Sequence, residues 1–195
     1  LGESGCGKSS LSLRFASNQF SHYSESTIGA SFFEKSMICK DEITGRKRKV
    51  AFNIWDTAGQ EKYHGLANMY YRGAGVAILV YDLSRTTSFR VLQEWAEELK
   101  AKGPPDIVLV VCGNKSDLIA SGDRKVPEDD AKKYADEIGA SYIETSARDS
   151  TNVVELFEEV ARRIPAIPNR TGSDVTNNST SIHLGATNES SGSCC

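Results

Sequence analysis

Two continuous apolar segments do most to limit the folds open to this chain. They are VAILVYDL at Val76–Leu83 and IVLVVC at Ile107–Cys112, and neither alternates regularly between apolar and polar residues. A strand that is apolar on both faces is typical of a parallel sheet covered by helices on each side. The two segments therefore predict an α/β fold built around a mostly parallel sheet.

Helices and further strands are predicted around these two segments. Helical spacing of apolar residues, or a proline suited to a first helical turn, predicts helices over Ser88–Lys102, Pro127–Ile138 and Asn152–Ile164. The strand candidates are Ser141–Ala147, which is weaker, and the pair Ser31–Lys40 and Lys49–Asp56, whose short polar link predicts an antiparallel hairpin. Strands that alternate with helices indicate a doubly wound sheet with helices on both faces.

Composition divides the 195 residues into a domain over residues 1–165 and a tail over residues 166–195. The tail is rich in Ser, Thr, Asn and Gly and poor in apolar residues, so we expect it to be disordered. A net charge of −3 gives no general attraction to nucleic acid, and we expect no such partner. The five cysteines form no C-x-x-C pair, which fits a reducing compartment rather than a zinc site.

A phosphate-binding loop is predicted at the start of the domain. GESGCGKS fits the pattern G-x-x-x-x-G-K-[ST], with Gly2, Gly7, Lys8 and Ser9 at the defined positions. Its glycines let backbone N–H groups point at phosphate oxygens, Lys8 adds a cation, and the Ser9 hydroxyl can bind Mg²⁺. The helix that follows, SSLSLRF at Ser9–Phe15, adds its positive N-terminal dipole, and Ser10 in its first turn is a further candidate binding residue. The loop alone does not identify the nucleotide.

The position of this loop leads to a separate expectation. The first residue is Leu1 rather than Met, and no strand precedes the loop in this sequence. We expect the chain to be truncated at its N-terminus and the first strand of the fold to be largely missing from it. We also expect this chain to bind nucleotide less tightly than a longer form.

A second motif, Asn114-Lys115-Ser116-Asp117, follows the strand at Ile107–Cys112 and lies where α/β sheets bind ligands. The carboxylate of Asp117 can accept hydrogen bonds from N1–H and the 2-amino group of guanine. Adenine has an acceptor at N1 and no 2-amino group, so this carboxylate would be left without a partner. A plain Asn/Asp turn after a strand is the alternative interpretation.

A third motif, DTAGQ, ends the strand at Lys49–Asp56. Asp56 is placed to hold a Mg²⁺ shell, and Gly59 can bring its N–H close to a terminal phosphate. Gln60 carries both a donor and an acceptor, so it can orient a water molecule for in-line attack.

Together the motifs resemble those of the Rab small GTPases in the Ras superfamily. They are GESGCGKS, STIGASF (Ser26–Phe32), WDTAGQE (Trp55–Glu61), YYRGA (Tyr70–Ala74), GNKSD and ETSA (Glu144–Ala147), in this order. STIGASF and KYHGLANMYYRGA are most similar to the early-endosomal Rab branch. The resemblance covers about residues 1–165 and implies a Ras-like P-loop NTPase fold.

The resemblance implies a role for each matching residue. For the phosphates and Mg²⁺ these are Ser4, Gly5, Cys6, Gly7 and Lys8 around the β-phosphate, Ser9, Thr27 and Asp56 around Mg²⁺, Gly59 at the γ-phosphate, and Gln60 as the catalytic residue. For the base they are Phe20 on the guanine edge, Asn114, Lys115 and Asp117, and Ser146 and Ala147 of the ETSA loop. Arg148 replaces the usual lysine there, and its aliphatic stem can still cover the ring.

Two further sets of residues are implied to face partners. Phe32, Trp55 and Tyr70 match the aromatic triad through which Rabs display their state to effectors, although the residues taken alone favour three core aromatics. Cys194 and Cys195 match the double cysteine that carries two geranylgeranyl groups in Rabs, with a disulfide or metal pair as the alternative. Two lipid chains give stable membrane anchoring where one does not.

The expected function is a GTP-hydrolysing switch in vesicle transport, with GTP or GDP and Mg²⁺ as cofactors. Its expected location is the cytoplasmic face of endomembranes, in particular early endosomes, with cycling to the cytosol. The implied partners are an exchange factor, an activating protein, effectors, and prenylation-escort and dissociation-inhibitor proteins. Two alternatives stay open: a P-loop ATPase or kinase, which the base motifs disfavour, and a non-catalytic nucleotide-binding adaptor.

Overall fold

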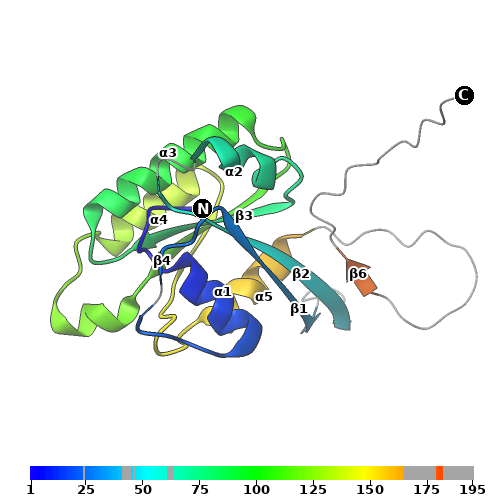
Figure 1. The fold of residues 1–195 in the computed structure, drawn as a ribbon, viewed down its shortest axis with the longest axis horizontal. Coiled ribbons are helices and arrows are strands. Elements are labelled where there is room, and N and C mark those ends of the chain that lie inside the picture. Colours follow the sequence, from blue (N-terminus) through cyan, green and yellow to red (C-terminus); the bar gives the residue numbers. More distant parts are fainter. Residues whose placement is uncertain (24, 41–44, 46, 61–63, 165–178, 182–195) are drawn as a thin grey trace, which may run out of the picture.

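The computed structural model describes residues 1–23, 25–40, 45, 47–60, 64–164 and 179–181. Its elements, in chain order, are α1 (Lys8–Ser17), β1 (Ala30–Lys40), β2 (Lys47–Thr57), α2 (His64–Tyr71), β3 (Val76–Asp82), α3 (Thr86–Lys102), β4 (Val108–Asn114), the 3₁₀ helix η2 (Ser116–Ser121), α4 (Glu128–Glu137), β5 (Ser141–Glu144), α5 (Val153–Arg163) and β6 (Ser179–Ser181). The strands lie between helices, with α2, α3 and α4 on one face and α1 and α5 on the other (Figure 1).

The parallel part of the fold follows from the two apolar segments. β3, β4 and β5 form a parallel sheet in that spatial order. Successive side chains of β3 enter different cores: Leu79 and Tyr81 pack with α3, and Val80 packs with α1 and α5. A strand buried on both faces has no solvent side, which explains why its sequence shows no regular alternation.

The hairpin is confirmed, and it belongs to a second sheet. β1 and β2 pair antiparallel from Ala30 opposite Thr57 to Lys40 opposite Lys47, and β6 joins β2 in parallel. The described strands of the two sheets are not hydrogen-bonded to each other. Leu1 pairs with β3 instead: its ammonium donates to the Ile78 carbonyl, and the Val80 N–H donates to the Leu1 carbonyl, both at 2.8 Å.

A cavity of about 150 Å³ lies at the junction of the two sheets. Its lining is mainly apolar and comes from β2, β3, α1, α2 and α5, with Phe52, Val80 and Phe157 among the contributors. The α/β class and the Ras-like arrangement of elements are confirmed, and the described strands form two sheets of three.

Two short elements and one strand end differ from the sequence-based prediction. α2 and η2 are too short to show a helical period in the sequence. The predicted strand Ser141–Ala147 ends earlier, because β5 stops at Glu144. The Thr145 N–H still donates to the Gly113 carbonyl of β4 at 2.8 Å, whereas the Ser146 N–H donates to the Thr151 carbonyl at 3.0 Å. Glu144 therefore ends β5, and the rest of the ETSA segment leaves the sheet as a loop.

Three aromatic rings form the centre of the core between the hairpin and the helices. Phe15 of α1 stacks on Phe157 of α5 with ring centroids 3.5 Å apart, and Phe52 of β2 meets both rings edge-on at 5.5 Å. Phe15 and Phe157 are 2% and 3% exposed, so truncation of either ring leaves a cavity that the surroundings can fill only in part.

We expect Phe157→Ala to lower the free energy of unfolding by about 3–5 kcal/mol, the range for loss of a buried aromatic ring. Urea unfolding followed by circular dichroism measures this. Val154→Ala on the same helix is the matched control, because Val154 is 47% exposed and little should change. A loss below about 1 kcal/mol for Phe157→Ala would show that the stacked rings are not central to the core.

Candidate functional site

One pocket of about 340 Å³ gathers most of the predicted binding residues. It lies where β4 ends and α1 begins, at the position expected for ligands of α/β sheets. The predicted residues that line it are Ser4, Gly5, Gly7, Lys8, Ser9, Ser10, Phe20, Thr27, Gly59, Asn114, Lys115, Asp117, Ala147 and Arg148. Cys6 and Ser146 do not line it, and both are fully buried next to it.

The phosphate loop curls because of its glycines. Gly5 and Gly7 have φ angles of 79° and 94°, which residues other than glycine rarely adopt. A Cβ at Gly7 would lie 2.2 Å from Nδ2 of Asn114, so the loop must pack directly on that side chain. α1 begins immediately afterwards at Lys8, which places a helix N-terminus at the pocket.

Lys8 and Gly59 meet at the far end of the loop. The Lys8 ammonium donates to the carbonyls of Gly2 at 2.9 Å and Glu3 at 3.0 Å, which holds it along the loop. A Cβ at Gly59 would lie 2.5 Å from both the Lys8 ammonium and the Ser4 nitrogen. Only glycine therefore allows this backbone to approach the loop, and Gln60 follows directly.

Ser9, Thr27 and Asp56 form a cluster of oxygens beside this point. The Ser9 and Thr27 hydroxyl oxygens are 2.8 Å apart, and the Thr27 hydroxyl donates to Oδ2 of Asp56 at 3.3 Å. Oδ1 of Asp56 is buried and has no hydrogen-bond partner. Burial raises the pKa of Asp56 above its ordinary value, against the opposing effects of Ser9, Lys8 and Thr27. Two hydroxyls beside a carboxylate oxygen that lacks a partner fit a hard divalent cation such as Mg²⁺.

Asn114 joins the predicted phosphate loop to the loops predicted to bind the base. Its side chain is 1% exposed, and its Nδ2 donates to the Cys6 carbonyl at 2.9 Å. Its Oδ1 accepts from the Thr145 hydroxyl and the Ala147 N–H, both at 3.2 Å. Asn114 therefore acts through protein contacts that fix the loops around the pocket.

Asp117 is oriented by two side chains of the ETSA loop. Its Oδ1 accepts a hydrogen bond from the Ser146 hydroxyl at 2.7 Å, and its Oδ2 lies 3.7 Å from the Arg148 guanidinium. The Asp117 side chain is only 10% exposed, so its carboxylate is partly withdrawn from water but still lines the pocket.

Arg14 of α1, which was not predicted from the sequence, supports the side of the pocket predicted to hold the base. Its Nε donates to the Ala147 carbonyl and its Nη2 to the Arg148 carbonyl, both at 2.9 Å. Its guanidinium also lies 5.8 Å from the centre of the Phe20 ring. An arginine on an amphipathic helix carries no local signal of such contacts. Five further lining residues were not predicted, namely Ser21, His22, Glu25, Ser26 and Leu118.

The three predicted effector aromatics form one connected cluster apart from the pocket. The ring centroids of Phe32 and Trp55 are 5.0 Å apart, and those of Trp55 and Tyr70 are 5.3 Å apart. Phe32 and Trp55 are opposite one another on β1 and β2. Phe32 is 51% exposed and Trp55 37%, so these two are surface side chains rather than core aromatics.

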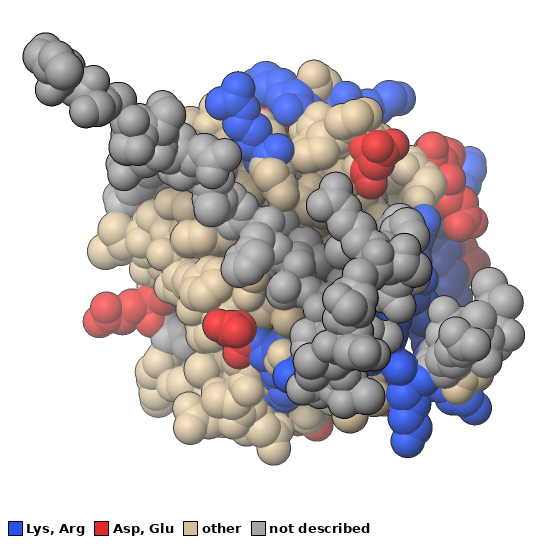
Figure 2. All heavy atoms as spheres, turned by 90° about the vertical axis from the view of Figure 1, so that its right-hand side faces the viewer, with Lys and Arg blue, Asp and Glu red and all other residues tan. Residues whose placement is uncertain are grey.

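The basic run at residues 46–49 is partly used within the fold. The Arg48 guanidinium donates to the carbonyls of Ala161 and Ile164, so it caps the C-terminal end of α5. Figure 2 shows Lys and Arg side chains in several separate places on its face, with Asp and Glu between them. The residues drawn there thus carry both signs of charge.

The predicted lipidation residues Cys194 and Cys195 lie outside the described residues, as does most of the predicted tail. None of the helices that the structure describes combines the length and the apolar character needed to span a bilayer.

Comparison with known proteins agrees with this geometry. A family model described as the Ras family matches residues 1–166. Ras-related protein RABF2b of Arabidopsis thaliana is 50% identical over 167 residues, which are 86% of this chain and 80% of the relative. Ras-related protein Rab-31 of Mus musculus is 45% identical over 196 residues, 100% of this chain and 94% of the relative. Ras-related protein Rab-5A of Dictyostelium discoideum is 50% identical over 168 residues, 86% and 80% of the two chains. The chain therefore belongs to the Ras family, and these relatives identify it as a Rab GTPase of the early-endosomal group.

Proposed function

We propose that the 340 Å³ pocket holds GTP or GDP with Mg²⁺, and that the chain works as a membrane-anchored switch on early endosomes. The observation that supports this most is the convergence of three chemistries on one pocket. A phosphate loop, an oxygen cluster suited to a cation and an oriented carboxylate for the base all contribute to its lining or adjoin it. Membership of the Ras family makes the chain a guanine-nucleotide-binding GTPase.

The phosphates occupy the curled loop in this proposal. The N–H groups of Ser4–Lys8 surround the β-phosphate, and the Lys8 ammonium exchanges its two carbonyl partners for phosphate oxygens. Ser9, Thr27 and Asp56 hold Mg²⁺, which supplies positive charge beside the outer phosphates. The Oδ1 of Asp56 thereby gains the partner that its burial requires.

The guanine base occupies the other end of the pocket. Asp117 accepts from N1–H and the 2-amino group, while Lys115, Ala147, Arg148 and Phe20 enclose the ring. Asn114 and Ser146 act by holding these loops in place. Adenine would leave a carboxylate in this orientation without its hydrogen-bond partners, which disfavours an ATPase or kinase.

We expect ADP to displace a fluorescent GDP analogue at least about 10⁴-fold less well than GDP, because adenine leaves Asp117 without partners. Asp117→Ala should weaken GDP binding and reduce that preference sharply. Asp106→Ala, at an exposed aspartate before β4, is the control and should behave like the parent. Equal competition by ADP and GDP would refute the assignment of Asp117 to the base.

Hydrolysis requires a positioned water and stabilisation of the charge on the γ-phosphate. Gln60 follows Gly59, whose backbone abuts the phosphate loop, so its side chain amide can orient the water. Residues 21–29 contain no arginine to act as a finger within the chain. An activating protein supplies that charge in our proposal.

We expect the parent to hydrolyse bound GTP more slowly than about 10⁻² s⁻¹, the rate given for Gα proteins that carry the arginine in cis. Gln60→Leu should abolish measurable turnover, because leucine cannot orient water. Single-turnover phosphate release measures both, with Gln93→Leu on α3 as the matched control. Unchanged hydrolysis in Gln60→Leu would contradict the catalytic role of Gln60. A parent without measurable turnover would contradict it too, and would support the non-catalytic adaptor instead.

Effectors recognise the GTP form through the exposed cluster of Phe32, Trp55 and Tyr70. Thr27 and Gly59 contact Mg²⁺ and the γ-phosphate in our proposal, and they lose these contacts after hydrolysis. The cluster lies on the elements next to both residues, so its geometry responds to the nucleotide state.

Alanine at all three aromatic positions should abolish binding of a Rab effector that recognises only the GTP-loaded parent. Calorimetric titration of the effector measures this, and loading with labelled GDP confirms that the nucleotide site is intact. Ile38→Ala is the control, since Ile38 is on the same hairpin and 68% exposed. Retained effector binding in the triple variant would exclude the cluster as the recognition surface.

Membrane attachment is the last part of the proposal. Residues 1–165 form the GTPase domain, and residues 166–195 act as a tether that carries geranylgeranyl groups on Cys194 and Cys195. An escort protein delivers the chain for prenylation, a dissociation inhibitor carries it through the cytosol, and an exchange factor reloads it with GTP. Mass spectrometry of the chain from its native cells tests the lipid, and unmodified thiols at both positions would refute it.

A further inference from the structure

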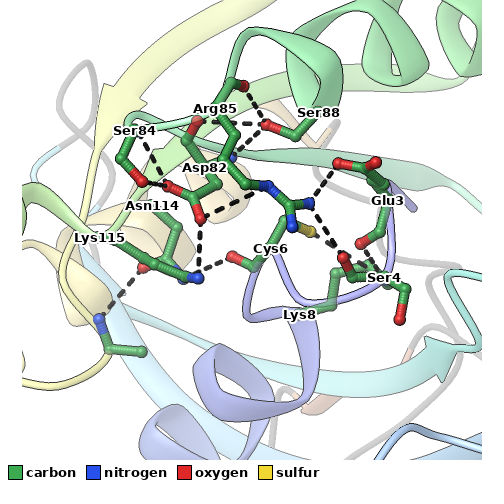
Figure 3. Close-up of polar contacts among 11 residues, drawn as sticks. Glu3, Ser4, Cys6, Lys8, Asp82, Ser84, Arg85, Ser88, Asn114 and Lys115 are labelled. Carbon is green, nitrogen blue, oxygen red and sulfur yellow. Dashed lines mark hydrogen bonds and ion pairs between the residues drawn. The ribbon is translucent and has the colours of Figure 1, made fainter. Parts of the chain in front are cut away.

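We propose that Arg85 and Asp82 are positioning residues that tie the phosphate loop to Lys115 and so set how long a nucleotide stays bound. Neither residue lines the pocket, and the sequence analysis assigned neither a role. The inference rests on the proposed function of the pocket. It follows from a line of four alternating charges, Glu3, Arg85, Asp82 and Lys115, which Figure 3 shows as a continuous set of contacts.

At one end of this line, Arg85 contacts the phosphate loop from outside the pocket. Arg85 precedes α3, and its Nη2 donates to the Glu3 carboxylate and to the Ser4 carbonyl, the latter at 3.1 Å. A Cβ at Gly5 would lie 3.8 Å from the Arg85 guanidinium. The guanidinium therefore spans three successive loop residues and restrains the backbone that surrounds the β-phosphate.

At the other end of this line, Asp82 contacts Lys115, which lies on the proposed base side of the pocket. Oδ2 of Asp82 lies 2.8 Å from the Lys115 ammonium and 3.9 Å from Nε of Arg85, and Oδ1 accepts from the Ser84 N–H and hydroxyl. Asp82 is 2% exposed, and burial alone would raise its pKa. The hydrogen bonds from Lys115 and Ser84 outweigh burial and hold the pKa of Asp82 below its ordinary value. Asp82 is therefore ionised and attracts both cations.

Lys115 is the residue that most needs such support. It lines the pocket, and its backbone is left-handed, with φ of 70°. This conformation is unfavourable for a residue with a side chain. The contact with buried Asp82 helps to keep Lys115 in this geometry, and the same carboxylate lies beside the arginine that grips the phosphate loop.

These contacts affect loop position more than stability. The side chains of Arg85 and Glu3 are 41% and 27% exposed, and ion pairs of this kind contribute little to folding because solvent screens them. Asn114 already links the two loops through the Cys6 carbonyl, deeper in the fold. The charged bridge adds an outer link, so its loss lets the loop open without unfolding the domain.

The test is the dissociation rate of fluorescently labelled GDP from the Mg²⁺-loaded full chain, measured with excess unlabelled GDP. We expect Arg85→Gln to raise this rate by about threefold to tenfold, the range between a screened ion pair and a charge-assisted hydrogen bond. Glu3→Gln should raise it less, and the double variant should match Arg85→Gln alone, because both remove the same link. Arg85→Lys should give an intermediate rate, since a single ammonium keeps the charge and loses the fork.

The matched control is Arg90→Gln, which removes the same charge from an exposed position on α3 and should leave the rate unchanged. The dependence of the dissociation rate on salt concentration distinguishes an electrostatic link from a change in packing. Between about 0.1 M and about 1 M salt the rates of the parent and Arg85→Gln should converge, because the screening length falls from about 10 Å to about 3 Å.

Two results would overturn the bridge while leaving the nucleotide site intact. One is equal dissociation from the parent and Arg85→Gln, in a preparation whose GDP preference depends on Asp117. The other is additive effects of Glu3→Gln and Arg85→Gln, which would show that the two residues act separately. A parent that retains no labelled GDP, or retains it independently of Asp117, would refute the proposed site itself and the bridge with it.

Discussion

The side chain amide of Asn114 is the contact on which the rest of the site depends. It is buried at the end of β4 and satisfies the Cys6 carbonyl on one side and groups of the ETSA loop on the other. A buried amide that forms three hydrogen bonds has few alternative positions, because any displacement leaves polar groups unpaired away from water. Asn114 therefore fixes the loop at Gly2–Lys8 relative to the segment that contains Thr145 and Ala147.

The parallel sheet explains why such a side chain can be found at that place. β3 and β4 end side by side, so Asp82 and Asn114 fall opposite each other in the sheet register. Asn114 then forms a neutral link between the loops through the Cys6 carbonyl, and Asp82 forms a charged link through Lys115. The fold thus provides two neighbouring, buried polar anchors at the same edge of the sheet.

Much of this arrangement could be predicted from the sequence, for reasons that differ between elements. The apolar segments at β3 and β4 predicted buried parallel strands, and the motifs around Lys8, Asp56, Gly59 and Asp117 predicted the pocket, because their spacing is itself chemically restrictive. Arg14 and Arg85 could not be predicted: each acts through backbone carbonyls or charges far away in the chain, and such contacts leave no local pattern.

The same limit applies to the division of the strands. Pattern and spacing predict which residues form strands, but they do not show which strand edges become paired. Among the described residues β3 is hydrogen-bonded to β4 and to Leu1 but not to β2, and this break is a property of tertiary pairing. β5 likewise ends earlier than predicted, because the Ser146 N–H donates to the Thr151 carbonyl in the following loop and not to β4.

Trp55 and Asp56 are neighbours on β2, and the alternation of a strand sends their side chains to opposite sides. One faces solvent within the aromatic cluster, and the other is buried in the oxygen cluster beside the phosphate loop. The proposed Mg²⁺ ligand and the proposed effector surface are thus separated by a single peptide unit. A displacement at the proposed Mg²⁺ site can therefore reach the exposed aromatic cluster through the backbone of β2, without passing through the core of the domain.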